Sequence, residues 1–410
     1  MNLLNNKKIN ADFFLLSLVI LIPLTLLIGS AAINTLIILV DIIFLYILIK
    51  NRELQFLKSK TLYLLLIIWC ALLINLIFSL NIESSYSRAL GFIRFVILVF
   101  AIKYILNKEL NFKKYIFISW SILFLIVTFD IFFEYIFGFN TLGFKSDYYP
   151  VRIASFFGEE LIVGSFFLGF GLFYISKIVI LLQRYKKLLI IITLALIFVS
   201  LLIGERSNFI KFFIASSILF YFIANISLKK VILMMAIFFL SFFASLNLNE
   251  GLKYRYKTEF LTADIKEVND ILKDSLYVAH YDAAFKIFQE YPIFGIGIKN
   301  FRTESRKNKY RNDKLLKTNS RGSTHPHQIH FEILSETGLF GYISFLILIM
   351  ASLTLSIKNY LKYKNFYQLS SIMGIIVFMI PFLPSGSFFS TFTAAIFWIN
   401  YAIMMGYNKK

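Results

Sequence analysis

Long apolar runs separated by short basic segments extend over most of the chain. A helix needs roughly 20 mostly apolar residues to cross a bilayer. We expect twelve such helices, at residues 13–29, 30–49, 61–80, 89–106, 115–137, 159–182, 188–204, 209–226, 230–248, 335–357, 366–383 and 386–407. The pattern therefore predicts an all-α polytopic membrane protein.

The basic residues of the short connecting segments fall on one side of the predicted bundle. If the N-terminus is cytoplasmic, the cytoplasmic segments contain 21 of the 42 Lys and Arg residues, against only Glu53 and Glu109. On the other side, the short turns at 29–31, 81–88 and 384–387 carry one basic residue, Arg88. Cytoplasmic loops are enriched in Lys and Arg, so both termini are expected in the cytoplasm. The first run, after Lys7 and Lys8, also has features of a cleaved signal peptide, but cleavage would give the remaining loops the wrong charge bias.

Residues 249–326 form one long loop, expected on the periplasmic side. The loop has 78 residues with 15 Lys or Arg and 10 Asp or Glu, and loops of this length are translocated largely regardless of charge. Loops this long are usually functional. An apolar stripe predicts an amphipathic helix that ends at Tyr291-Pro292 and caps the membrane domain. The stripe consists of Leu272, Leu276, Ala279, Ala283 and Ile287. We therefore divide the chain into residues 1–248, 249–326 and 327–410.

Composition supports a membrane protein and excludes several other classes. The chain is 59% hydrophobic and only 16% charged, whereas soluble domains are about half apolar and a quarter charged. With 48 Phe among 410 residues, a disordered chain is excluded. The net charge of +19 is expected at membrane edges in so apolar a chain, so the predicted partner is a lipid bilayer and not nucleic acid. The single cysteine, Cys70, excludes a disulfide framework and a thiolate metal cluster.

All histidines of the chain lie between residues 280 and 330. They are His280, His325, His327 and His330. Histidine titrates near neutral pH, so the cluster indicates proton transfer. Pro326 fits the first position of a helix capped by Ser323 or Thr324. His327 would then lie in the first turn, where the helix dipole favours a neutral imidazole and attracts an anion. We therefore expect His327 to act as a general base beside a phosphate-bearing substrate.

Two other interpretations of this cluster stay open. The pattern His-x-His-x-x-His supplies nitrogen ligands for a metal ion, although no nearby carboxylate spacing matches a hydrolytic zinc site. The histidines could also be packing residues at the membrane interface. We expect neither a metal nor another cofactor.

Arginine residues lie on the same predicted side as the histidines. Arg206 occupies the turn after the 188–204 run, where Glu205 is a candidate ion-pair partner. Arg152 lies in the 138–158 loop, and Arg255 starts the long loop. Arginine stays charged and donates two parallel hydrogen bonds, so these residues are candidates to hold a diphosphate leaving group. Arg302, Arg306, Arg311 and Arg321 are further candidates, although a basic run in a loop is usually a solvated surface.

Four short motifs follow one another along the chain. The first runs from Arg152 through Gly158-Glu159-Glu160 to Gly164-Ser165, and the second is Gly204-Glu205-Arg206. The third is Tyr291-Pro292-Ile293-Phe294-Gly295-Ile296-Gly297-Ile298-Lys299-Asn300-Phe301. The fourth is His327-Gln328, followed after nine residues by Gly338 and after two more by Gly341-Tyr342. In a twelve-span frame with one long outer loop, these motifs resemble those of the bacterial O-antigen ligase and polymerase superfamily, over about residues 60–400. In the first motif, Ala154-Ser155 stands where that family usually has a glycine.

The resemblance implies a metal-independent, inverting glycosyltransferase of the bacterial inner membrane, which takes glycan from undecaprenyl diphosphate at the periplasmic face. By this resemblance, His327 is the general base that deprotonates the acceptor hydroxyl. Arg206 and Arg255, with Arg152 as a further candidate, would hold the diphosphate. Supporting roles fall to His325 or His330, which would orient His327, and to Gln328 and Glu336. For Glu336, a structural role is the alternative.

The resemblance leaves several functions to compare. A ligase transfers finished glycan to the lipid A core, whereas a polymerase adds repeat units to a growing glycan, and both use the same donor. The Gly-Glu-Glu stretch and the chain length favour a ligase. A relative acting on protein hydroxyls is disfavoured because no further soluble domain is present. A transporter should carry ionisable groups or broken helices in two related halves, whereas here such groups are scattered: Asp41, Arg94, Asp130, Glu134 and Lys211.

Overall fold

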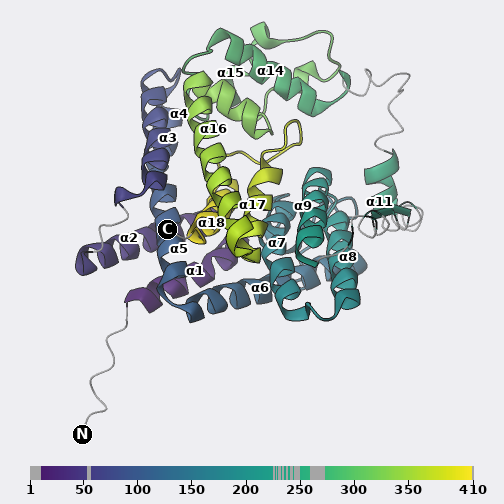
Figure 1. Cartoon of the computed structure of the whole chain (residues 1–410). Helices are drawn as coiled ribbons and strands as arrows, with labels where there is room; N and C mark the ends of the chain where they lie inside the picture. The colour runs from purple at the N-terminus through teal and green to yellow at the C-terminus, as the bar shows by residue number, and fades with distance from the viewer. Residues whose placement is uncertain are drawn as a thin grey trace.

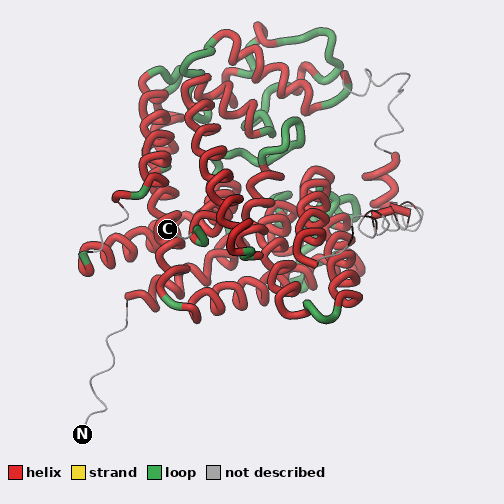
Figure 2. Tube along the Cα trace, in the orientation of Figure 1, coloured by secondary structure: helices red, strands yellow, loops and turns green. Residues whose placement is uncertain are grey.

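The computed structural model describes residues 11–52, 57–224, 250–258 and 273–408, with scattered positions between 227 and 243. The structure is 76% helical, and the described residues contain no strand (Figure 2). The all-α prediction is confirmed.

The predicted apolar runs form most of the helices (Figure 1). They are α1 (Ala11–Ile28), α2 (Ser30–Asn51), α3 (Lys60–Ile77), α4 (Ile82–Gly91) with α5 (Ile93–Lys108), α6 (Leu110–Phe137), α7 (Val163–Leu182), α8 (Lys186–Leu202), α9 (Arg206–Ala224), α16 (Ile329–Tyr363), α17 (Phe366–Phe378) and α18 (Thr391–Gly406). Within the described residues, seven helical segments are long and apolar enough to cross a membrane: α1, α2, α3, α4 with α5, α6, α7 and α16. The predicted run at 230–248 lies largely outside the described residues, so the count of twelve spans stays a prediction.

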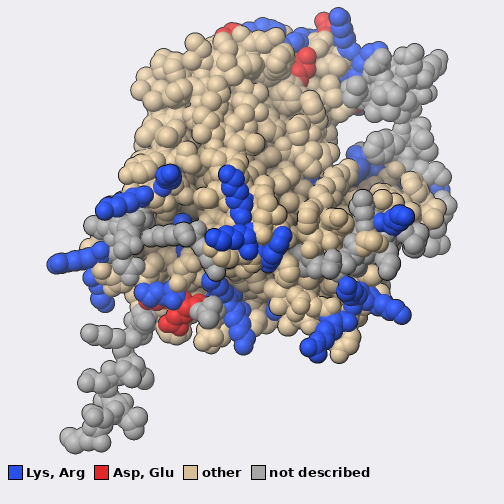
Figure 3. All heavy atoms as spheres, in the orientation of Figure 1, with Lys and Arg blue, Asp and Glu red and all other residues tan. Residues whose placement is uncertain are grey.

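The surface of these helices is suited to lipid. Large apolar side chains point outward on several helices, with Ile49 and Ile77 each 75% exposed and Leu181 67% exposed. Exposed apolar surface on this scale marks contact with a membrane or a partner. Figure 3 shows, on the face in view, a band without charged side chains between the basic lower half and the charged end at α14 (Leu276–Glu290) and α15 (Phe301–Glu304).

The loops predicted on one side of the membrane meet at one end of the molecule. The backbone of Leu80 donates to Ile296 (3.0 Å), and that of Ile153 donates to Ile203 (3.2 Å). The two ends of the described chain meet elsewhere: near the end of α5, Tyr104 bonds to Asp12 and Asn107 bonds to the Gly406 carbonyl, each at 2.9 Å. α18 begins beside the loops named first and ends at Gly406. Both ends of the described chain therefore lie at the other end of the molecule from these loops.

The main core joins the apolar helices around large aromatic side chains. Trp398 of α18 is fully buried, with ring centroids 5.1 Å from Phe397 and 5.4 Å from Phe92. A separate small core lies beneath α14 (Leu276–Glu290) and contains Ala283, Ile287 and further residues of the long loop. The amphipathic helix is therefore present, with its cap at Ser275 and its end before Tyr291-Pro292. Leu272 of the predicted stripe lies outside the described residues.

Residues 292–297 fill a break in α16 at Gly338. The backbone of Gly338 has φ +63° and ψ −168°, which interrupts the helix. The freed N–H groups of Leu339 and Phe340 donate to the carbonyls of Pro292 (2.8 Å) and Ile293 (3.0 Å), while Gly297 donates to the Glu336 carbonyl at 2.9 Å. A Cβ on Gly338 would lie 2.3 Å from the Ile293 oxygen, so the close approach requires glycine. The third and fourth motifs thus form one structural unit.

Candidate active site

His327 lies before α16 and not in its first turn, which corrects the sequence expectation. The N-cap is Gln328, whose Oε1 accepts from the backbone of His330 (2.7 Å) and of Phe331 (3.1 Å). His327 itself has φ +58°, in a region that non-glycine residues rarely adopt. Its carbonyl accepts a hydrogen bond from the Ser385 backbone at 2.7 Å. The cap predicted at Ser323 or Thr324 is therefore wrong, and a contact with the segment before α18 fixes the His327 backbone.

The His327 ring is half-buried among other rings and faces a hydroxyl. Its centroid lies 4.1 Å from that of His325 and 5.2 Å from that of His280, and the Tyr277 ring meets it edge-on at 5.8 Å. Ser323 Oγ lies 3.0 Å from Nε2. Burial, and to a smaller degree the neighbouring His280, lowers the pKa of His327 to about 4. A neutral imidazole is thus favoured by burial, whereas the sequence pattern attributed it to a helix dipole.

The supporting candidates fall into different surroundings. His325 packs against His327, and burial together with His327 and Lys299 lowers its pKa well below the ordinary value. His330 faces away, bonded through Nε2 to the Met379 carbonyl (2.8 Å) and through Nδ1 to the Tyr342 hydroxyl (2.9 Å). Of the two histidines proposed to orient His327, only His325 is therefore in contact with it.

Glu336 serves the join between α16 and residues 292–301. The Phe301 backbone N–H donates to the Glu336 carboxylate at 3.3 Å. The backbone carbonyl of Glu336 accepts a hydrogen bond from the Asn75 side chain at 2.9 Å. Its side chain is fully buried. These contacts match the structural alternative that the sequence analysis left open for this residue.

The segment 384–388, between α17 and α18, is a part of the site that the sequence analysis missed. Ser387 donates to the buried carboxylate of Glu332, and the Phe388 backbone donates to the same carboxylate at 2.7 Å. Lys299 donates to Ser387 at 2.9 Å. The segment thus connects the start of α16 with the third motif. A cluster of Pro, Ser and Gly in an otherwise apolar region was the available signal.

The turn 203–206 brings the first two motifs together. Gly204 has φ +78°, and a Cβ there would lie 2.4 Å from the Val151 carbonyl oxygen. Arg255, in the short π-helix η3 (Tyr254–Thr258), donates from Nε to the Gly204 carbonyl at 2.9 Å. Arg206 is the first residue of α9. Arg152, Arg206 and Arg255 therefore all lie next to the turn at Gly204.

Glu205 lies among these arginines. Its carboxylate accepts from the Gly164 backbone (2.9 Å) and from Asn208 (2.6 Å), and burial raises its pKa. Burial, followed by the nearby Arg255, lowers the pKa of Arg152, while Glu205 opposes this shift. The sequence analysis offered Arg206 as the partner of Glu205, but the described contacts relate Glu205 to Arg152 and Arg255 as well.

The loop that carries Arg152 has a serine in a conformation that favours glycine. Ser155 has φ +50°. Its hydroxyl donates to Asp130 at 2.6 Å, and the Ala154 backbone donates to Glu134 at 3.1 Å. Two buried carboxylates of α6 therefore hold this part of the loop in place.

Residues 384 and 385 connect the start of α9 with the histidine cluster. Ser207, which follows Arg206, donates to the Pro384 carbonyl, and the Ser385 backbone donates to the His327 carbonyl at 2.7 Å. α14, which carries Tyr277 and His280, packs against α16. The predicted base and the predicted diphosphate-binding residues therefore share one end of the molecule.

The other loop arginines show no common function. Arg321 is buried and donates to the carbonyls of Thr318, Arg306 and Lys307, which stabilises the loop. Arg302, Arg306 and Arg311 are exposed, and Arg311 pairs with Asp313. They match the solvated surface that the sequence analysis considered.

The histidine rings do not converge on a point. His280 and His327 are stacked at an interplanar angle of 24°. Among the described residues, no three His, Cys, Asp or Glu side chains are arranged to hold one metal ion. The His280 and His327 rings are therefore in packing contact.

Residues 188–346 match the family model described as O-antigen ligase. This match covers 159 of the 410 residues, and over this region the chain is similar to O-antigen ligases. The matched region contains Arg206, Arg255 and His327 and ends within α16, whereas Arg152 precedes it. No curated protein matches the chain. This similarity supports a membrane-embedded enzyme that acts on lipid-linked glycans.

Proposed function

We propose that this protein is an O-antigen ligase, which transfers glycan from undecaprenyl diphosphate to the lipid A core with inversion at the transferred sugar. The observation that supports this most is the position of His327: a half-buried imidazole, with its pKa lowered to about 4, next to a hydroxyl and connected through Ser385 and Pro384 to the start of α9, where Arg206 lies.

His327 is the general base of this proposal. The acceptor hydroxyl attacks the anomeric carbon of the donor glycan as its proton passes to the imidazole, and the bond from that carbon to the phosphate oxygen breaks. Ser323 Oγ lies 3.0 Å from Nε2, and in this proposal the acceptor hydroxyl takes the place of the serine hydroxyl at this nitrogen. A base must lie at hydrogen-bond distance from the proton it takes. His325, packed against the ring, restricts the orientation of His327.

Arg206, Arg255 and Arg152 receive the leaving group. The lipid diphosphate departs with additional negative charge, which fixed guanidinium groups stabilise without reorganisation. Arg255 is anchored to Gly204 through Nε, so its remaining N–H groups keep a fixed direction. The three positive groups supply charge that other enzymes obtain from a metal ion, and the proposed reaction therefore needs none.

The location follows from the charge pattern of the sequence. We place the enzyme in the bacterial inner membrane with both termini in the cytoplasm and His327 at the periplasmic face. The arrangement of loops supports this placement, because the chain ends lie opposite the end that carries the site.

Complementation tests the proposal and its alternative. The gene is expressed in strains that lack either the ligase or the polymerase, and the glycan ladder is read on a gel. Conversion of lipid-linked glycan into lipid A-linked glycan in the first strain is the expected result. Restored chain length in the second strain alone would assign polymerisation instead. Restoration in neither strain, with the protein correctly inserted, would contradict both.

A further inference from the structure

α9 carries a buried lysine that the proposed reaction does not use. Lys211 follows Arg206 by five residues and is 1% exposed. Ionisable residues buried in the apolar part of a membrane protein are costly and usually functional. Its Nζ donates to the Pro384 carbonyl at 2.7 Å and lies 5.8 Å from the centre of the Phe378 ring. Ser207, also on α9, donates to the same carbonyl.

Pro384 directly precedes Ser385, which contacts His327. The next residue, Ser385, donates its backbone N–H to the His327 carbonyl at 2.7 Å. Lys211 is thus linked to the backbone of the proposed base through two hydrogen bonds and a single peptide. Because His327 has φ +58°, its conformation costs energy and depends on such external bonds.

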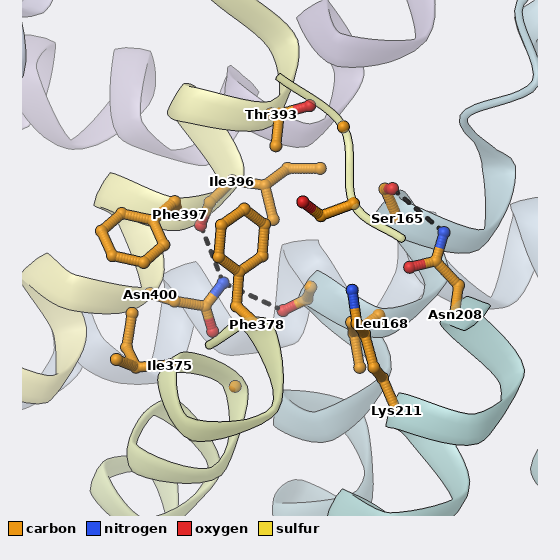
Figure 4. A pocket seen from close by; sticks show the side chains of 14 residues that line it. Ser165, Leu168, Asn208, Lys211, Ile375, Phe378, Thr393, Ile396, Phe397 and Asn400 are labelled. Carbon is orange, nitrogen blue, oxygen red and sulfur yellow. Dashed lines mark hydrogen bonds between the residues drawn. The ribbon is translucent and has the colours of Figure 1, made fainter. Parts of the chain in front are cut away.

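Empty space lies beside this connection. A pocket between α7, α9, α17 and α18 is bordered by Ser385 and Gly386 on one side and by Lys211, Asn208 and Asn400 on others. Figure 4 shows the Lys211 amine and the Asn208 and Ser165 side chains around it. Packing therefore leaves this face of the 384–386 segment unsupported, and hydrogen bonds to Pro384 hold it in place.

We propose that Lys211 is a positioning residue, which holds Pro384 and Ser385 and so fixes His327 relative to Arg206 on the same helix. This role rests on the proposed function, because it has meaning only if His327 takes the proton. The lysine touches neither the reacting atoms nor the diphosphate. It determines how far apart the base and the diphosphate-binding arginine are held.

The test replaces Lys211 in the full-length protein in liposomes containing lipid-linked glycan and acceptor. Lys211→Met keeps the length of the side chain and removes its donors. We expect kcat to fall about 10- to 100-fold, as displacements near 1 Å do, while KM for the donor changes by less than about twofold. Lys211→Arg, which keeps a donor next to the open pocket, should recover most of kcat. Lys358→Met, at an exposed position near the other end of α16, is the matched control and should retain full activity.

The pH profile distinguishes a positioning role from a general loss of stability, because lower stability alone would not shift the acid limb of kcat/KM. The titratable groups facing the His327 ring are Tyr277 and His280 of α14 and His325 on its own segment, while Lys299 acts on His325. These groups remain in Lys211→Met. A loosened ring becomes more exposed, so the acid limb of kcat/KM should move from about 4 toward the ordinary histidine value of about 6.5.

The outcomes separate the two proposals. If wild type and His327→Ala transfer glycan equally, the proposed function fails and the positioning role fails with it. If transfer depends on His327 but Lys211→Met keeps kcat and the acid limb of wild type, only the positioning role is overturned. Should Lys211→Met not insert, Ser207→Ala decides, because it removes one of the two donors to Pro384. A drop in kcat of about threefold at constant KM supports the role, and no change refutes it.

Discussion

The acid limb of the pH–rate profile is a direct consequence of the position of His327. The perturbation is a change of pH alone, applied to the wild-type enzyme. Burial and the neighbouring His280 lower the pKa of His327 to about 4, and a lowered histidine pKa means that the neutral, proton-accepting form persists to lower pH. The expected profile is therefore flat well below the region in which histidine-dependent enzymes usually lose activity.

The magnitude follows from the titration of one group. At pH 5.5, an imidazole with pKa of about 6.5 is about 9% neutral, whereas one with pKa of about 4 is about 97% neutral. The two cases differ about tenfold in kcat/KM at this pH. The ratio kcat/KM reports the free enzyme, so it is unaffected by the charge of the bound diphosphate.

Initial rates in liposomes at low donor concentration, from pH 4.5 to pH 8, give this profile. Circular dichroism at each pH identifies any loss of fold. A fall of kcat/KM centred near 6.5 in a folded enzyme would refute the reasoning, because it would show that the ring is as accessible to water as in a peptide.

Three further predictions concern other parts of the structure. Arg206→Lys should lower kcat about tenfold or more, because a point charge does not replace the two-bond fork. Arg184→Lys, in the exposed turn between α7 and α8, is the control, and equal rates for both variants would argue against a diphosphate contact. Gly338→Ala should cost about 3 kcal/mol or more through lost hydrogen bonds and the 2.3 Å approach to Ile293. Its unfolding temperature in detergent should fall by about 5 °C or more. Gly143→Ala, with φ +84° and no neighbour within 4 Å, should lose far less, and similar losses would contradict a steric cause. Chelation followed by dialysis should leave the transfer rate unchanged, and recovery of a lost rate by added zinc would support the metal alternative.

Apolar runs predicted the helices well because their cause is local. A segment that is apolar over about 20 residues satisfies its backbone groups in lipid only as a helix, and the stripe of the long loop likewise gave the helix that ends before Tyr291-Pro292. The positions of helix breaks and turns were harder to predict from the sequence. Gly338 was recognised as part of a motif, but its role in admitting residues 292–297 depends on a contact between segments about 40 residues apart.

The site was predicted in its residues more than in its geometry. The motifs selected His327 and the three arginines, which the structure brings to one end of the molecule. The helix start was misplaced because Pro326, Ser323 and Thr324 form a plausible local cap, whereas the Gln328 side chain caps the helix instead. Lys211 looked like a scattered charge because its partner, Pro384, lies 173 residues further along the chain.

Glycan transfer by His327→Ala, measured together with donor binding, tests the central claim most directly. Wild type and variant are reconstituted in liposomes at equal amounts, and the dissociation constant of the lipid-linked donor is determined beside the rate of transfer. The account predicts that transfer falls by at least about 10²-fold while donor affinity stays within about twofold, because the arginines still hold the diphosphate. Transfer at the wild-type rate in a variant that binds donor normally would show that another group takes the proton.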